Sequence, residues 1–224
     1  MPPLWNGWAL PAPRWKIHLL EREATMALSL EESRRELQER QGLGARYDAL
    51  QAPHADLALA RLGAAYFARK LNELSDADLA LPSRVVGWSR RHVVAHVAYQ
   101  ARGLARLVEA ARQGRGAERL EEPEAQIEEV DFGASLPAHA LRYLFHHAQI
   151  HLNVEWRDLQ DAGWRASIES LQGRLVPIRE TPWIRARAIW QAAVQLDNGA
   201  SSHHFPQALS QRFGAEAGVD ALSS

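Results

Sequence analysis

The stretch "GWSRRHVVAHVAYQARGLARLVEAA", residues 87–111, decides the fold, because its apolar residues return every three or four positions, the period of an α-helix. Ser89 can cap the amino end of this helix, which we expect to run to Gly114. The residues that share its apolar face are Val93, His96, Val97, Leu104, Leu107, Val108 and Ala111. His96 is the one polar member, and the pattern predicts that it points into the core.

The same period recurs in three other segments. Residues 55–74, 135–163 and 181–197 each carry one apolar stripe and are bounded by capping residues, Pro or Gly. The residues between them differ: 113–134 is expected to be a polar connection, and minor short strands are expected near 172–179. Four long amphipathic helices predict an all-α protein, an antiparallel four-helix bundle.

The two ends of the chain do not follow this pattern. Residues 1–25 carry three Trp and four Pro without a regular period, and we interpret them as an irregular extension or a Trp-rich docking arm. A Ser29-x-x-Glu32 capping box then predicts a helix through about Gln41. The expected organisation is therefore an extension at 1–25, a helical domain at 26–206 and a tail at 207–224.

Composition excludes several partners and chemistries. Lys and Arg number 26 and Asp and Glu 27, so the net charge is −1 and no broad basic field exists for nucleic acid or an anionic membrane. The chain has no cysteine, so a metal must sit on His, Asp or Glu, and a reactive thiol must be borrowed. No segment is apolar enough to span a membrane, and we expect a cytoplasmic protein.

Inward side chains of helical bundles often bind metals, so His96 is the first candidate ligand, although a single inward histidine is more often a hydrogen-bonded core residue. His92, one turn earlier, could chelate with it, but the adjacent Arg90 and Arg91 favour a solvated position. Arg90 and Arg91 could in turn bind an anionic substrate or thiol cofactor, or simply begin the helix in solvent.

Two blocks carry a family resemblance. "LPSRVVGWSRRHVVAHVAYQARGLARLVEAARQG" (81–114) and "RETPWIRARAIWQAAVQLDNGASSHHFP" (179–206) resemble the mycothiol-dependent maleylpyruvate isomerase family, whose metal-binding amino-terminal domain is DinB-like. The resemblance covers most of residues 26–206. It implies a DinB-like bundle in which the second histidine of His-x-x-x-His, here His96, is a metal ligand.

The resemblance also implies two further ligands on the last helix, a glutamate and a histidine, but these positions hold Ala188 and Ala192. Gln195 replaces a further carboxylate. The inherited metal site is therefore expected to be dismantled, unless it has been rebuilt elsewhere. The alternative set is His147, His151 and Glu155, spaced four residues apart on one helix face, with His96 completing it from the facing helix. His203 and His204 in "SSHHFP" are a weaker alternative.

For function, the resemblance implies a divalent metal, zinc by preference, and mycothiol or another small thiol, acting on a small-molecule substrate by cis–trans isomerisation of the maleylpyruvate type. Three hypotheses stay open. The chain is a metal- and thiol-dependent isomerase or transferase, a catalytically degenerate member that binds ligands or partners, or a structural bundle. A homodimer is a further possibility.

Overall fold

The computed structural model describes residues 47–114, 123–169 and 175–222. The chain divides into two units, Met1–Arg46 and Tyr47–Ser224. The expected extension at 1–25 and the helix through Gln41 lie outside the described residues.

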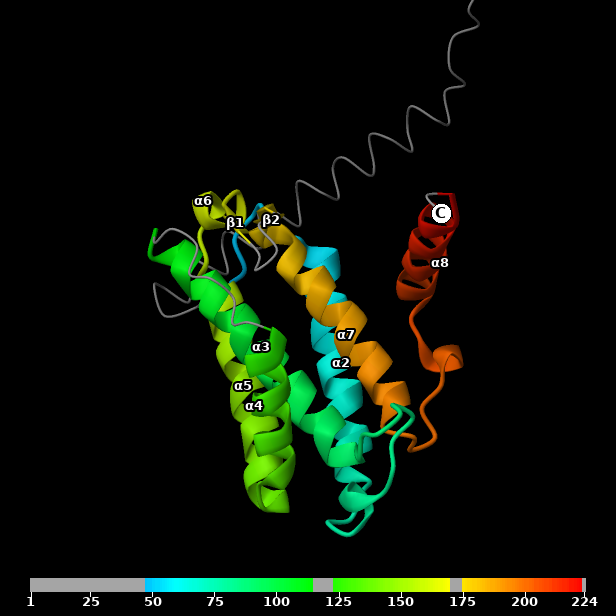
Figure 1. Cartoon of the computed structure of the whole chain (residues 1–224). Helices are drawn as coiled ribbons and strands as arrows, with labels where there is room; N and C mark the ends of the chain where they lie inside the picture. Colours follow the sequence, from blue (N-terminus) through cyan, green and yellow to red (C-terminus); the bar gives the residue numbers. More distant parts are fainter. Residues whose placement is uncertain (1–46, 115–122, 170–174, 223–224) are drawn as a thin grey trace, which may run out of the picture. The chain divides into compact units, whose positions relative to one another are not determined.

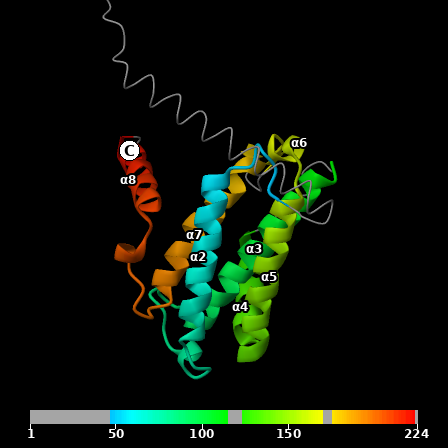
Figure 2. The same cartoon turned by 180° about the vertical axis from the view of Figure 1, so that it is seen from behind.

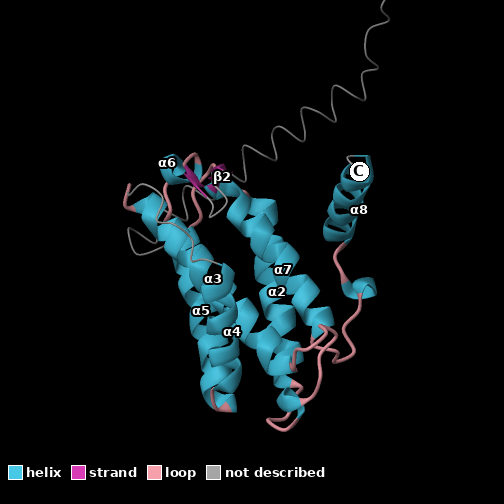
Figure 3. Ribbon diagram, viewed as in Figure 1, coloured by secondary structure: helices cyan, strands magenta, loops and turns pink. Residues whose placement is uncertain are grey.

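Four long helices dominate the second unit: α2 (His54–Asn72), α3 (Arg90–Arg112), α5 (Ala138–Asp158) and α7 (Thr181–Gln195). α3 packs along α5, α2 packs along α7, and α3 also contacts α7 (Figures 1 and 2). The colouring by secondary structure in Figure 3 shows how little strand accompanies them. The predicted all-α class is confirmed.

The apolar stripe predicted for α2 is buried, because it packs directly on α7. Leu57, Phe67 and Leu71 are at most 2% exposed. Gly63 allows the two helices to approach closely, since a Cβ at this position would lie 2.6 Å from Cγ2 of Ile189. Trp190 of α7 donates its indole N–H to the carbonyl of Leu59 at 3.1 Å across the same interface.

The helices do not simply alternate in direction. The guanidinium of Arg91 bonds the carbonyl of Ala134 just ahead of α5, and Arg112 pairs with Glu155 near its end, so α3 and α5 run parallel. α7 runs antiparallel to this pair. The indole N–H of Trp156, near the end of α5, donates to Thr181 at the start of α7 at 3.1 Å, and Arg90 at the start of α3 donates to the carbonyl of Leu196 at the end of α7.

This parallel pair requires a return segment, which the sequence analysis missed. The expected polar connection contains a helix, α4 (Pro123–Ser135), which packs on α3 and carries the chain back to the level where α3 begins. Val130 and Ala134, one turn apart, are buried. A single buried strip on a Glu-rich helix gave too weak a period to be recognised.

Small elements complete the unit. After α6 (Asp161–Trp164), β1 (Ser167–Glu169) pairs antiparallel with β2 (Leu175–Pro177), and Ile168 lies opposite Val176. β2 lies where short strands were expected. Short 3-10 turns cover Asp78–Ala80, Ile178–Glu180 and Ser202–His204.

The segment expected to be a tail forms α8 (Gln207–Leu222). Its Arg212 pairs with Asp56 at 2.7 Å and lies 3.7 Å above the ring of Trp183. Leu209 is fully buried. No helix in the described ranges is long and apolar enough to cross a lipid bilayer.

Candidate functional site

His96 lies on α3 at the edge of its buried face. Val93 and Val97 are buried as predicted, whereas His96 is exposed, which corrects the expectation that it points into the core. α4, α5 and α7 all pack on α3, yet none of them covers the side chain of His96. Its ring packs on one side against Trp88, with 5.4 Å between the ring centroids.

Although solvent reaches one side of the ring, the surrounding protein affects its titration. Burial lowers the pKa of His96 below its ordinary value, and the positive charge of Arg185 lowers it further. Desolvation disfavours the imidazolium and a nearby cation repels it. His96 is therefore a neutral imidazole at neutral pH, with one nitrogen able to accept a proton or hydrogen bond.

Arg185 of α7 is fully buried, and burial lowers its pKa to about 9. Its Nη1 donates to the carbonyl of Val97 at 2.7 Å and to Oε1 of Gln100 at 2.8 Å. Its Nη2 donates to Oε1 of Gln149 at 2.9 Å. All these acceptors are neutral, so the guanidinium is hydrogen-bonded by groups that leave its positive charge uncompensated. Nε2 of Gln149 makes no hydrogen bond within the described structure.

α7 faces this part of α3 with methyl groups. Two hydrogen bonds fix the register of α3 against α7: Arg90 Nε donates to the carbonyl of Leu196 at 2.7 Å, and Arg185 donates to the carbonyl of Val97. Between these two hydrogen bonds lie His96 on α3 and the turn from Ala188 to Ala192 on α7. Ala192 is buried and Ala188 is partly buried. We call Trp88, His96, Gln100, Gln149, Arg185, Ala188 and Ala192 the His96 site.

The residues present do not fit a metal. Zinc sites in proteins use three or four His, Cys, Asp or Glu ligands. In residues 47–114, 123–169 and 175–222, no three such side chains are placed to hold one ion. The His96 site offers a single imidazole.

The alternative ligand row lies on α5, on the side of a groove formed with α3. The rings of His147 and His151 are 6.5 Å apart between centroids, and Nε2 of His151 lies 3.6 Å from Oε1 of Glu155. Glu155 is buried and paired with Nε of Arg112 at 2.9 Å. The structure does not bring His96 together with this row as a metal-binding group.

The basic residues at the start of α3 bond the ends of other helices. Arg90 donates to the carbonyls of Leu196 and Asp197 at the end of α7. Arg91 donates to those of Ala134 and Leu136 at the end of α4. Such contacts satisfy carbonyls that a helix end leaves without partners. The predicted role of Arg90 and Arg91 in holding a cofactor stays a prediction.

His92 and His204 each have a local partner. His92 closes the capping box of α3, because the backbone N–H of Ser89 donates to its Nδ1 at 3.2 Å. Its Nε2 lies 3.7 Å from Asp131. His204 is exposed and shares a 3.1 Å hydrogen bond with the hydroxyl of Tyr66 on α2.

Arg185 and its two glutamine partners were not predicted from the sequence. A signal was present, since Arg185 falls one turn before Ile189 and two before Ala192, on the buried face of α7. A charged residue in that register indicates a buried cation.

Fold and site together define a helical domain organised around a buried arginine and a neutral histidine. The sequence profile of the mycothiol maleylpyruvate isomerase N-terminal domain matches residues 60–194. Two solved structures of the mycothiol-dependent maleylpyruvate isomerase, one of them a histidine-to-alanine mutant, match with a TM-score of 0.69 and 36% and 35% identity. Each match covers 73% of this chain and 68% of the other. A search of curated proteins found no match. The chain belongs to the mycothiol maleylpyruvate isomerase family.

Proposed function

We propose that this chain is a metal-free member of its family that binds a small thiol, mycothiol or a relative of it, together with a small carboxylate substrate at the His96 site. The observation that carries the proposal is the pair of alanines, Ala188 and Ala192, on the turn of α7 that faces the His96 region. A methyl group has no lone pair, so one imidazole would remain to hold an ion that needs three or four ligands. Metal-dependent isomerisation is therefore not part of the proposed function.

What remains at the site suits an anion better than a cation. Arg185 places an uncompensated positive charge behind the ring of His96, where the low dielectric of the interior extends its field. A divalent ion would be repelled by this charge, whereas a thiolate or a carboxylate would be stabilised. The neutral His96 can accept the proton or hydrogen bond of a thiol. Trp88 supplies an apolar wall beside it.

Dependence on mycothiol is a property of the solved relatives and comes to this chain as part of the proposal. It agrees with the absence of cysteine from the sequence, because a thiol at this site must then come from outside.

Calorimetric titration of the protein with mycothiol tests the proposal. We expect saturable binding at one site, unchanged by a chelator. His96→Ala should weaken it by about three- to tenfold, the effect of losing one hydrogen bond. His139→Ala, at an exposed histidine of α5 outside the site, is the matched control and should bind as the unmodified chain does. Binding that disappears with the chelator, or that both substitutions weaken equally, would contradict the proposal.

We also propose a homodimer and a cytoplasmic location. A metal site rebuilt on His147, His151 and Glu155 is the alternative to the metal-free proposal. The geometry disfavours this alternative site, because the carboxylate of Glu155 is already paired with Arg112. Zinc bound by the native chain and lost on His147→Ala would revive it.

A further inference from the structure

The interior beside His96 contains hydrogen-bond donors that no described residue accepts. Oε1 of Gln149 accepts from both Nε and Nη2 of Arg185, at 3.3 and 2.9 Å. Nη1 donates to Gln100 and to the carbonyl of Val97. Because a guanidinium carries five N–H groups, one N–H of Nη2 is left over within the described ranges. The bonds of Arg185 also fix the orientation of Gln149, since only its oxygen can accept from a guanidinium.

The side-chain nitrogen of Gln149 is the second unused donor. Its Nε2 has no hydrogen-bond partner in the described structure, although the residue is only 8% exposed. Buried polar groups in proteins are nearly always hydrogen-bonded. The charge beside it is unmatched as well, because no carboxylate in the described ranges pairs with Arg185 and burial alone lowers its pKa. Unused donors next to an unmatched cation indicate a site for a negatively charged acceptor.

Gln100 is the partner of Arg185 that a ligand can displace. It lies one turn after His96 on α3 and is partly exposed, whereas Gln149 is buried. Its neutral Oε1 accepts from Nη1 of Arg185 at 2.8 Å, at a position that suits a carboxylate oxygen. A carboxylate that arrives from the His96 side can exchange with this oxygen, because a charged acceptor forms a stronger hydrogen bond with a guanidinium than an amide oxygen does.

We propose that Arg185 and Gln149 form the carboxylate subsite of the His96 site. One carboxylate oxygen replaces Oε1 of Gln100 on Nη1 of Arg185, and the carboxylate also accepts from Nε2 of Gln149 and from the remaining N–H of Nη2. The substrate class is a small carboxylate that presents this group to the interior, with the rest of the molecule toward His96 and solvent. The inference rests on the proposed function, since it names the atoms that hold the carboxylate there.

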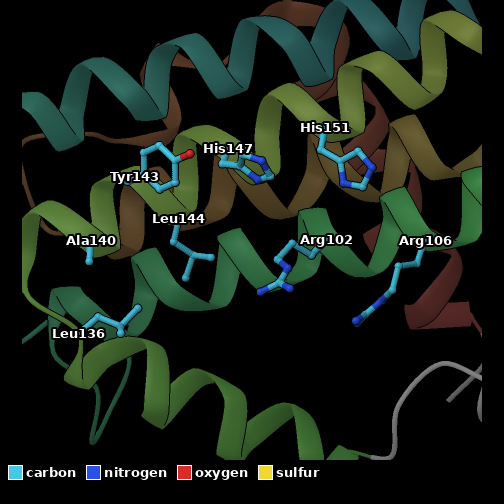
Figure 4. Close-up of a pocket in the computed structure, with 8 residues that line it drawn as sticks. All are labelled: Arg102, Arg106, Leu136, Ala140, Tyr143, Leu144, His147 and His151. Atoms are coloured by element: carbon cyan, nitrogen blue, oxygen red, sulfur yellow. The ribbon is translucent and has the colours of Figure 1, made fainter.

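Titration of isotopically labelled protein with acetate, followed by proton–nitrogen NMR, tests the subsite. Acetamide, which has the same shape without the charge, is the control ligand. We expect the side-chain amide signals of Gln149 and Gln100 to shift saturably with acetate at constant ionic strength, and acetamide to bind at least about tenfold more weakly. Arg185→Met should remove the binding. Arg102 and Arg106 line the groove between α3 and α5 (Figure 4), so Arg102→Gln with Arg106→Gln is the control and should leave the Kd for acetate unchanged.

The two glutamines should respond in opposite directions. Gln149→Glu keeps an acceptor for Arg185 but replaces the unused N–H groups by a carboxylate, so acetate should bind at least about tenfold more weakly. Gln160→Glu adds the same charge at an exposed position and should leave binding unchanged. Gln100→Ala removes the competing acceptor, so acetate should bind about three- to tenfold more tightly. Circular dichroism verifies that each variant keeps the helical fold.

The inference is overturned if acetate does not saturate, if acetate and acetamide bind alike, if Gln149→Glu has no effect, or if Gln100→Ala binds acetate more weakly. Titration of the same samples with mycothiol separates the two proposals. Mycothiol binding without acetate binding would refute the subsite alone. Acetate binding without mycothiol binding would support the subsite and refute the proposed thiol binding.

Discussion

Replacing Arg185 by methionine tests whether a buried, uncompensated cation organises the His96 site. Burial lowers the pKa of Arg185 well below its ordinary value, to about 9, a shift equivalent to roughly 5 kcal/mol of disfavoured charge. Methionine fills a similar volume without this cost. It also removes the donor from Gln149, and an unsatisfied buried polar group costs about 1–3 kcal/mol. Gln100 and the carbonyl of Val97 lose the same donor.

These opposing contributions nearly cancel, so we expect the free energy of unfolding of Arg185→Met to change by less than about 2 kcal/mol. Adding Gln149→Leu removes the side-chain amide that has lost its hydrogen-bond donor, so it should restore part of any decrease in the free energy of unfolding. Urea unfolding followed by circular dichroism measures both effects. A loss above about 4 kcal/mol in the single variant would refute the reasoning, because it would mean that the cation itself stabilises the fold.

The same variant has a second readout at the site. Arg185 contributes to the lowered pKa of His96, so its removal should raise that pKa. The C2 proton of His96 reports the titration by NMR. An unchanged pKa would mean that the charge of Arg185 does not reach the ring.

The remaining predictions concern pH, helix contact and helix ends. Burial lowers the pKa of His96 below its ordinary 6.5, so the unfolded chain binds the proton more readily than the folded chain does. The free energy of unfolding should therefore decrease as the pH falls below 6.5. His96→Gln should make this decrease smaller, as measured by urea unfolding at several pH values. Gly63→Ala should destabilise the fold by about 1–3 kcal/mol, since the added Cβ would lie 2.6 Å from Ile189. Gly103→Ala should instead stabilise the fold by about 0.5–1 kcal/mol, because a Cβ at that position would meet nothing within 4 Å. Thermal unfolding measures both effects. Arg91→Ala should speed amide hydrogen exchange at the end of α4, whose carbonyls it bonds, and unchanged exchange there would contradict that role.

The four long helices could be predicted because each is long enough for its apolar residues to repeat several times. The stripe of Leu57, Phe67 and Leu71 in α2 is buried as the period indicated. The family could also be predicted, from two blocks whose order and spacing agree with it. Helix α4 could not, because its buried surface is one narrow strip on a polar segment.

The site was harder to predict, since periodicity gives the face of a residue relative to its own helix and not which neighbours cover that face. His96 shares its face with buried valines, yet the neighbours of α3 leave it exposed. Arg90 and Arg91 read as solvated residues at a helix start, whereas they bond carbonyls far away in sequence. Arg185 was read only as part of a family pattern, and its burial depends on glutamines supplied by two other helices.

Zinc content is the most direct test of the central claim, that the chain keeps the fold of its family without the metal centre. After zinc loading and dialysis, elemental analysis should find far less than one equivalent in the native chain. Ala188→Glu with Ala192→His should bind about one equivalent, because two ligands are returned opposite His96. A full equivalent of zinc in the native chain, lost on His96→Ala, would contradict the account.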